Sequence, residues 1–298
     1  MALRVVMLQN PTVMATPSLP PDTRIGSVHL RVADLERQVA FYRDALGFTL
    51  LAEDGATAAL GSSSDRPLVV LHEAPGAPPA PQGAPGLFHM ALLLPDRLAL
   101  SGMIRRVRSH GATFDGFADH NVSEAAYLRD PEGNGIELYA DRVRSVWRTV
   151  EGRIFMTTEP LDLPGLLAAT TEPAPALPGE TVMGHIHLRV SSLAAAEAFY
   201  VDRLGFDVVT RDYPGALFVA AGDYHHHVGL NVWGSRAGAP APEGARGLVS
   251  FDVVVPPVSA RRTLLGGDDE GTLSDADQHT VRIRAPGASG GPTPRGGG

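Results

Sequence analysis

Cysteine and lysine are both absent from this chain of 298 residues, because its 25 basic side chains are all arginine. Without cysteine there is no disulfide, no zinc–thiolate or iron–sulfur site and no thiol nucleophile. Without lysine there is no Schiff base and no phosphate-loop lysine. The reactive side chains that remain are carboxylates, hydroxyls and 11 histidines. The placement of the histidines therefore decides which chemistry is open to the protein.

Basic runs and long apolar runs are also missing. The formal charge is −8, and an acidic chain without basic runs argues against nucleic acid or an anionic membrane as a partner. No apolar run approaches the roughly 18 residues of a membrane-spanning helix. Polar Gln9 and Asn10 interrupt the short apolar stretch near the N-terminus, which is unlike a secretory signal. We expect a cytoplasmic protein whose partner is a small molecule.

An internal repeat organises the chain. Residues 29–48 match residues 187–206 at 12 of 20 positions, with a constant offset of 158, and such a repeat indicates a repeated structural unit. Each copy begins with an alternating apolar segment, which is typical of a strand. It continues with a helical pattern that ends at Gly47 or Gly205, and three short apolar segments follow. Segments near residues 86 and 247 begin in the same way, so the chain is predicted to contain four β-α-β-β-β modules.

These modules predict an α+β fold with two pseudo-barrels. A four-stranded curved sheet with one helix is closed only by pairing with a second unit, and the concave face of the pair can hold a ligand. Segments rich in proline and glycine set the boundaries. The predicted regions are a flexible N-terminal extension (1–22), a first domain of two modules (23–144), a linker (145–182), a second domain of two modules with the last one shortened (183–285), and a disordered tail (286–298).

Four sequence strings carry a resemblance to a known family: GLFHMALLLPDR, DHNVSEAAYLRDPEGNGIELYADR, GHIHLRV and YHHHVGLNVW. With them, the chain resembles the vicinal oxygen chelate superfamily, which includes glyoxalase I, bleomycin and fosfomycin resistance proteins and extradiol dioxygenases. The resemblance is strongest to bacterial catechol 2,3-dioxygenase-like proteins. It covers roughly residues 22–257 and fades in the fourth module. It implies a metal-dependent enzyme that acts on a small aromatic molecule and O2.

The resemblance also implies the metal ligands, which the family takes from the first and last strands of paired modules. Carried over to this sequence, they are His89 and Glu137 in module two and His185 in module three. The last-strand position of module three falls at His227, and Val228 and His225 remain open within a slip of one or two residues. His227 would support the site rather than complete it.

The corresponding positions of the other two modules are filled differently. Module one has Ser27 where module three has His185, and module four has Ser250 and Arg282 where module two has His89 and Glu137. Modules one and four therefore cannot build this site, whereas modules two and three fill it. We infer that modules two and three share one barrel and that modules one and four share the other.

Two imidazoles and one carboxylate form the facial triad of non-haem Fe(II) oxygenases, which leaves three positions for a catechol and O2. Without thiolates the site suits Fe(II) or Mn(II). The resemblance further implies that Tyr127, ten residues before Glu137, contacts bound oxygen, and that His120 holds or protonates the substrate. The spacing from His120 to Tyr127 is two residues shorter than the family pattern.

Two other functions remain open from the sequence. A glyoxalase-like lyase or isomerase would use Ni(II), Zn(II) or Mn(II) and a four-ligand site that includes His227. A binding protein of the resistance type would hold a small molecule without turnover, and the shortened fourth module keeps this alternative open. His187 and its repeat counterpart His29 are expected to be structural. Exposed sheet edges make a homodimer plausible in this fold.

Overall fold

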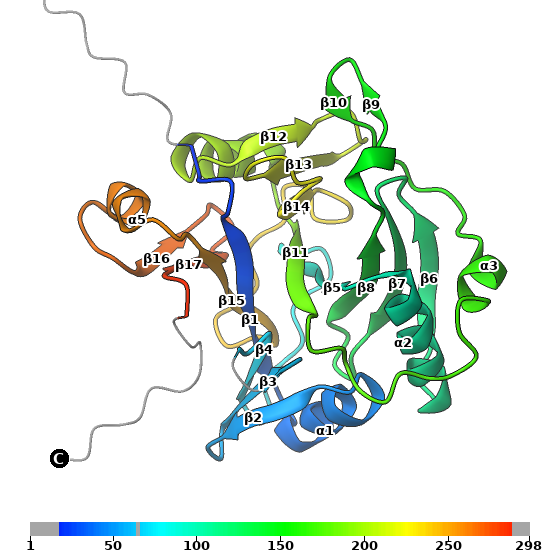
Figure 1. Ribbon diagram of the computed structural model, residues 1–298. Helices are drawn as coiled ribbons and strands as arrows, with labels where there is room; N and C mark the ends of the chain where they lie inside the picture. The colour runs from blue at the N-terminus through cyan, green and yellow to red at the C-terminus, as the bar shows by residue number, and fades with distance from the viewer. Residues whose placement is uncertain (1–17, 64–65, 288–298) are drawn as a thin grey trace, which may run out of the picture.

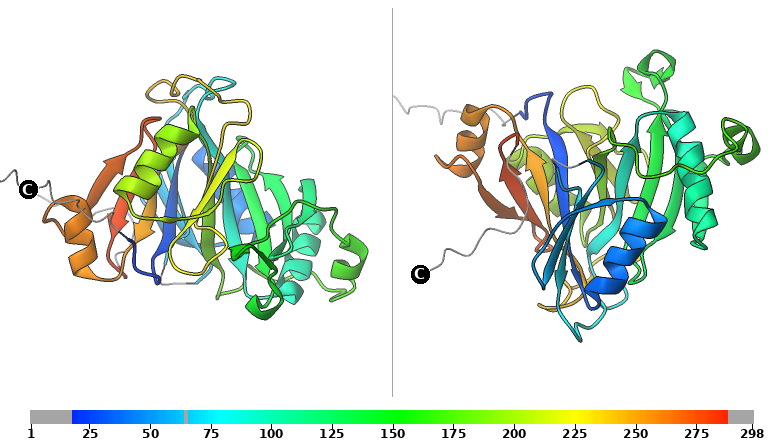
Figure 2. Two further views of the ribbon diagram at one scale, coloured as in Figure 1. Left: turned by 90° about the horizontal axis from the view of Figure 1, so that it is seen from above. Right: turned by 60° about the horizontal axis from the view of Figure 1, so that its bottom comes forward.

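The computed structural model describes residues 18–63 and 66–287. It contains one sheet of seven strands, one sheet of eight strands and a two-stranded hairpin, with few helices (Figure 1). Figure 2 shows module two, in green, towards one end of the molecule and module four, in orange and red, at the other. The α+β prediction is confirmed.

The elements follow the predicted modules, with two short helices that continue as π-helix. Module one contains β1 (Arg24–Val32), α1 (Leu35–Ala40), η1 (Phe41–Ala45), β2 (Thr49–Glu53), β3 (Thr57–Gly61) and β4 (Val69–Glu73). Module two contains β5 (Gly86–Leu94), α2 (Arg97–Ser109), β6 (Phe114–Asp119), β7 (Ser123–Arg129) and β8 (Gly135–Asp141). Module three contains β11 (Val182–Arg189), α4 (Leu193–Glu197), η3 (Ala198–Arg203), β12 (Asp207–Thr210), β13 (Ala216–Ala220) and β14 (Val228–Asn231).

Module four is shorter than a β-α-β-β-β unit. It contains β15 (Gly247–Val254), α5 (Val258–Leu265), β16 (Gly271–Ser274) and β17 (Thr280–Arg284). It therefore has three strands, one fewer than each of the other modules, and the sequence had indicated a shortened last module. The linker forms η2 (Arg144–Val146), the hairpin of β9 (Thr149–Val150) and β10 (Arg153–Ile154), and α3 (Leu163–Leu167).

The strand order confirms the inferred pairing of modules. One sheet runs β12-β13-β14-β11-β5-β8-β7-β6 and joins modules three and two, and the other runs β16-β17-β15-β1-β4-β3-β2 and joins modules four and one. The joining pairs, β5 with β11 and β1 with β15, are both antiparallel. Each sheet therefore takes one module from 23–144 and one from 183–285, so neither sheet corresponds to one half of the sequence.

The turn between β7 and β8 of module two is hydrogen-bonded to module one. The Asp130 carboxylate accepts the backbone N–H groups of Glu132 and Asn134, both at 2.9 Å, and the buried Tyr42 hydroxyl donates to it at 3.1 Å. The Glu132 carboxylate in turn accepts the N–H of Ala33, just before α1, at 2.8 Å. These bonds satisfy backbone donors at a helix start and tie the turn between β7 and β8 to the first module.

The turn between β16 and β17 repeats this arrangement against module three. Asp275 accepts the N–H groups of Asp277 and His279, both at 2.9 Å, and the Tyr200 hydroxyl at 3.1 Å. Asp277 accepts the N–H of Ser191 at 2.8 Å. Asp275, Asp277 and His279 lie close enough together to hold a cation. Their carboxylates are already bound to N–H and O–H donors, so this cluster is a structural turn.

The end of the predicted N-terminal extension is part of the folded core. Leu19 is buried and its N–H donates to the carbonyl of Gly205 at 2.8 Å. The predicted boundary at residue 22 is therefore too late. Residues 1–17 of the predicted extension and 288–298 of the predicted tail lie outside the described residues. Within the described ranges, no helix is both long and apolar enough to cross a membrane.

Candidate metal centre

Three adjacent strands bring the predicted ligands together. In the eight-stranded sheet, β5 lies between β11 and β8. His89 on β5 lies opposite His187 on β11, two residues after His185. On the other side, Ala91 lies opposite Glu137 on β8. Residues two apart on a strand face the same side of the sheet, so His89, His185 and Glu137 project from one face.

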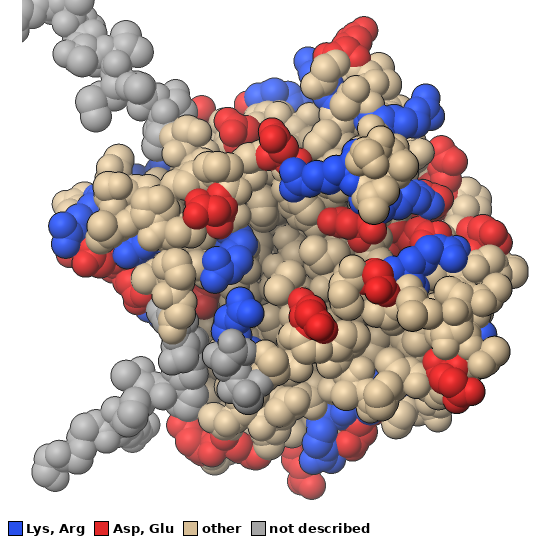
Figure 3. Space-filling view, in the orientation of Figure 1, with Lys and Arg blue, Asp and Glu red and all other residues tan. Residues whose placement is uncertain are grey.

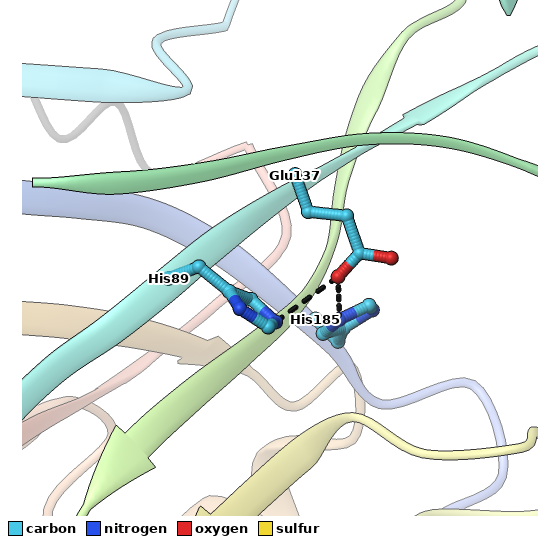
Figure 4. Close-up of side chains that lie close together, drawn as sticks. All are labelled: His89, Glu137 and His185. Atoms are coloured by element: carbon cyan, nitrogen blue, oxygen red, sulfur yellow. Dashed lines mark hydrogen bonds and ion pairs between the residues drawn. The ribbon is translucent and has the colours of Figure 1, made fainter. Parts of the chain in front are cut away.

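The three side chains converge on one carboxylate oxygen (Figure 4). Oε2 of Glu137 lies 3.0 Å from Nε2 of His89 and 3.0 Å from Nε2 of His185. One ligand atom from each residue lies within 4.8 Å of the others. All three residues are buried, with at most 6% of their surface exposed. The spacing of these donor atoms is compatible with one shared metal ion.

The charges at this cluster favour a cation. Burial alone would raise the pKa of Glu137, but His185 and His89 outweigh it and hold that pKa well below its ordinary value. Burial lowers the pKa of His185 to about 4, against the opposing effect of Glu137. An ionised carboxylate thus faces a neutral imidazole in a buried site, which is costly without compensation. Among the described residues, Nδ1 of His185 also lacks a hydrogen-bond partner. The nitrogen and oxygen donors fit a divalent metal ion.

Tyr127 and His120 lie beside this cluster. Tyr127 on β7 is directly opposite Glu137 on β8, and burial, followed by the charge of Glu137, raises the pKa of its hydroxyl well above the ordinary value. The Tyr127 hydroxyl lies 2.6 Å from Nε2 of His120, whose Nδ1 lies 2.6 Å from the carbonyl of Thr157. Between β6 and β7 the chain turns at Asn121, whose φ is 65°.

His227 is not at the cluster, contrary to the prediction. Its Nδ1 accepts the N–H of Ala221 at 3.1 Å, and it is not among the residues that line the neighbouring cavity. The resemblance placed His227 on the last strand of module three, but β14 begins only at Val228. In the preceding loop, His225 and His226 turn into the cavity instead. The ring of His226 lies 4.1 Å from that of His185, centroid to centroid.

The metal cluster opens onto a cavity of about 280 Å³. Its walls come from both modules of the sheet and from the linker, which contributes Met156, Thr157 and Thr158. The other lining residues are Phe88, His89, His120, Val122, Ser123, Tyr127, Glu137, His185, His187, Tyr213, Phe218, His225, His226 and Trp233. Most of these side chains are aromatic or apolar, which is typical of a small-molecule site.

Several cavity residues were not predicted from the sequence. Phe88 and Phe218 lie on strands, where an apolar residue in the sequence indicates an ordinary core position. Tyr213 and Trp233 lie in loops, and Thr157 lies in the linker, where no sequence pattern indicated a site. A possible signal was the position of Phe88 beside His89, but strand alternation would place such neighbours on opposite faces.

His187, which was expected to be structural, is exposed to the cavity. Its ring lies 5.0 Å from that of His89, centroid to centroid. Burial, followed by the neighbouring His89, holds its pKa well below the ordinary value. Its Nε2 lies 3.0 Å from Nδ2 of Asn231.

The seven-stranded sheet has the same geometry with different residues. Ser250 lies opposite His29 there, as His89 lies opposite His187. Arg282 lies opposite Asp252, as Glu137 lies opposite Ala91. Arg282 contacts Asp252 at 3.0 Å and donates to Nε2 of His29 at 2.7 Å. The positions therefore correspond as inferred from the sequence, and a cation of the protein itself takes the place of a metal ligand.

Comparison with known proteins gives the family. The model of the glyoxalase/bleomycin resistance protein/dioxygenase superfamily matches residues 24–138 and 182–282. Catechol-2,3-dioxygenase of Bacillus subtilis (strain 168) is 48% identical over 244 residues, which cover 80% of this chain and 85% of that protein. Biphenyl-2,3-diol 1,2-dioxygenase 3 of Rhodococcus globerulus is 28% identical over 40% of this chain and 63% of its own length. This chain belongs to the glyoxalase/bleomycin resistance protein/dioxygenase superfamily.

Solved structures share the fold at low sequence identity. A putative dioxygenase from Bacillus subtilis has a TM-score of 0.61 at 12% identity, with 90% of this chain and 86% of that chain covered. Glyoxalase I from Zea mays has a TM-score of 0.52 at 18% identity, with 88% and 92% covered. These two likenesses confirm the vicinal oxygen chelate fold.

Proposed function

We propose that this protein is an extradiol, catechol 2,3-type dioxygenase, an oxidoreductase that cleaves the ring of a catechol-type aromatic with O2. The observation that carries the proposal is the buried convergence of His89, Glu137 and His185 on one side of the cavity. The similarity to catechol-2,3-dioxygenase of Bacillus subtilis, at 48% identity over most of both chains, supports it.

The proposed cofactor is Fe(II), held by His89, Glu137 and His185. A bound iron supplies the redox chemistry that couples the aromatic diol to O2. Glu137 contributes the negative charge, and the two imidazoles contribute neutral donors, so the residues that hold the ion are matched to a hard divalent cation. Mn(II) fits the same donor set, and Ni(II) and Zn(II) are the metals of the lyase alternative.

His120 and Tyr127 are proposed to handle protons at the substrate. The Thr157 carbonyl accepts the Nδ1 proton of His120, so Nε2 of the neutral ring is an acceptor. The Tyr127 hydroxyl donates to that nitrogen in the substrate-free protein. When a catechol binds, its hydroxyl proton can pass to Nε2, and the same nitrogen can return a proton as the product forms. Because Tyr127 stays protonated, its O–H remains a donor to an oxygen in the cavity.

The position of His227 argues against a lyase or isomerase. A four-ligand site including His227 would have favoured that class, and His227 is turned away from the cavity with its Nδ1 bound to a backbone N–H. The cavity walls are continuous with the metal cluster, which supports turnover rather than storage of a ligand. A cytoplasmic location and a homodimer remain predictions.

The proposal is tested by oxygen uptake. Protein purified without air and loaded separately with Fe(II), Mn(II), Ni(II) or Zn(II) is mixed with catechol in an oxygen electrode. We expect consumption of one O2 per catechol in the iron form, with formation of a coloured ring-cleaved product. Turnover without oxygen consumption in the nickel or zinc form would instead identify a lyase or isomerase. Binding of catechol with no product in every metal form would identify a binding protein.

A further inference from the structure

A chain of hydrogen bonds determines which nitrogen of His187 carries the proton. The backbone N–H of Trp233 donates to Oδ1 of Asn231 at 3.0 Å, which settles the orientation of this fully buried amide. The amide NH2 group therefore faces Nε2 of His187 at 3.0 Å. Since an amide NH2 group only donates, Nε2 accepts, and the proton of the neutral ring is on Nδ1.

The Nδ1–H group of His187 is left for a ligand. Within the described part of the chain, this nitrogen has no hydrogen-bond partner, although the ring is buried and lines the cavity. The ring packs against Gly229, where a Cβ atom would come within 2.9 Å of two ring carbons and 3.1 Å of Nδ1. The absence of a side chain at Gly229 is therefore what allows the ring to occupy this position.

The seven-stranded sheet shows which way the free edge of the ring points. There, His29 lies between His72, at 3.0 Å, and Arg282, at 2.7 Å. Asn231 corresponds in position to His72. Asn231 lies opposite Arg189, two residues after His187, and His72 lies opposite Arg31, two residues after His29. Glu137 has the position of Arg282. The edge of His187 away from Asn231 therefore faces the metal end of the cavity.

The cavity also limits the charge and the size of its ligand. Apart from histidines, Glu137 is the one ionisable group with a charge near neutral pH among the described residues that line it, and no arginine contributes. An anionic substituent would lose its hydration there without a counter-charge. The volume of 280 Å³ exceeds the roughly 150 Å³ that accommodates benzene. Beyond a catechol ring there is room for a substituent against Phe88, Phe218 and Trp233.

We propose that the substrate is an uncharged catechol with a small substituent next to the diol, and that Nδ1–H of His187 donates a hydrogen bond to an acceptor atom on that substituent. This inference rests on the proposed function and adds the substrate class. The aromatic rings around His187, at centroid distances of 5.1, 5.5 and 5.6 Å for Phe88, Phe218 and Trp233, enclose the apolar part of the substituent. His187 is then a specificity-determining residue.

The test compares two substrates of the same size. In 3-methoxycatechol an ether oxygen takes the place of one methylene group of 3-ethylcatechol, so their kcat/KM ratio reports the hydrogen bond and cancels the effect of size. We expect the substitution His187→Phe, which keeps a ring and removes the donor, to lower the methoxy-to-ethyl ratio roughly threefold to tenfold. The matched control is His29→Phe in the other sheet, which should leave the ratio unchanged.

A second variant and a charged substrate complete the test. Gly229→Ala keeps His187 but pushes its ring off the backbone, and it should lower the ratio in the same direction. In the wild type, 2,3-dihydroxybenzoate should have a kcat/KM at least about a hundredfold below that of 3-ethylcatechol. Iron content, measured for every variant, shows whether the metal site is intact.

The outcomes separate the two proposals. An unchanged ratio in an iron-loaded His187→Phe variant would overturn the role of His187, and efficient turnover of 2,3-dihydroxybenzoate would overturn the uncharged substrate class. Either result would leave the dioxygenase function standing. If the iron-loaded wild type consumes no oxygen with catechol or any of the three substituted catechols, the proposed function itself is wrong.

Discussion

Arg282 occupies in the seven-stranded sheet the register position that Glu137 occupies in the eight-stranded sheet. Each lies on the last strand of its module. Arg282 is opposite Asp252 on the first strand of module four, and Glu137 is opposite Ala91 on the first strand of module two. One sheet therefore has a buried anion at this position and the other a partly buried cation. The same fold supports a candidate metal site in one case and an internal ion pair in the other.

Replacing Arg282 by methionine should destabilise the protein and leave its metal site intact. The substitution removes the partner of the buried Asp252, at a cost of about 3 kcal/mol in the free energy of unfolding. Burial raises the pKa of Asp252, against the effects of Arg282 and Arg284, and loss of Arg282 raises it further. A carboxyl group whose pKa is raised in the folded state stabilises the fold at low pH, and this stabilisation is lost as the pH rises through the folded-state pKa. Urea unfolding should therefore show a smaller difference between the variant and the wild type near pH 4 than at pH 7, with iron content at pH 7 unchanged.

Glu137→Gln should remove the metal. The amide keeps the size of the side chain but carries no charge. Mutation of residues that only support metal ligands typically lowers metal affinity by roughly 10–100-fold, and we expect a larger loss of iron affinity here because a ligand itself is changed. The matched control is Glu124→Gln. Glu124 is also buried in the eight-stranded sheet, but it pairs with Arg97 at 2.6 Å. Metal analysis after dialysis would contradict the site if the two variants retained equal amounts of iron.

His120→Asn and Tyr127→Phe should reduce the rate without releasing iron. Both substitutions remove the 2.6 Å hydrogen bond between these side chains, and the first also removes the proton acceptor. A side chain that transfers protons typically increases the reaction rate by about 10²–10⁴-fold. We therefore expect kcat of His120→Asn to fall by roughly that factor and kcat of Tyr127→Phe to fall by less. Stopped-flow kinetics with metal analysis of the same samples makes the measurement. A parallel loss of iron would assign these residues to metal binding instead.

His279→Asn should weaken the fold at neutral pH more than at acid pH. Burial raises the pKa of Asp275, but hydrogen bonds and charge from His279 outweigh it and leave that pKa below the ordinary value. A lowered carboxyl pKa gives stability that is present above the unfolded-state pKa near 3.9 and is lost as pH falls through the folded value. With asparagine, the site would resemble the turn at Asp130, whose pKa burial raises despite the amide of Asn134.

We expect this variant to lose about 1–3 kcal/mol of unfolding free energy at pH 7, with the difference from wild type shrinking below about pH 4. Urea unfolding between pH 3 and pH 7 makes the measurement. A difference that is constant across that range would show that His279 acts through packing and not through the charge of Asp275.

The sequence predicted the modules and their pairing, and its resemblance to the superfamily indicated three residues that the structure brings together. Local alternation of apolar residues indicated the strands, and the family resemblance placed His89, His185 and Glu137 on three of them. Predictions failed where structure is not periodic. His227, which the resemblance placed on a last strand, lies in the loop before β14 and does not line the cavity. Leu19 is buried by contact with a segment far along the chain. Trp233 and Thr157 reach the cavity through loop and linker conformations that no local pattern encodes.

The pairing of β1 with β15 has a consequence for the order in which the protein is made. More than 200 residues separate these strands, so module one leaves the ribosome long before its sheet partner exists. Until β15 arrives, one side of β1 is an open strand edge, the kind of surface that recruits other chains. Contacts between such distant segments also form slowly. Nascent chains stalled before β15 should therefore be the species most dependent on chaperones, although every residue of the metal centre has already been synthesised.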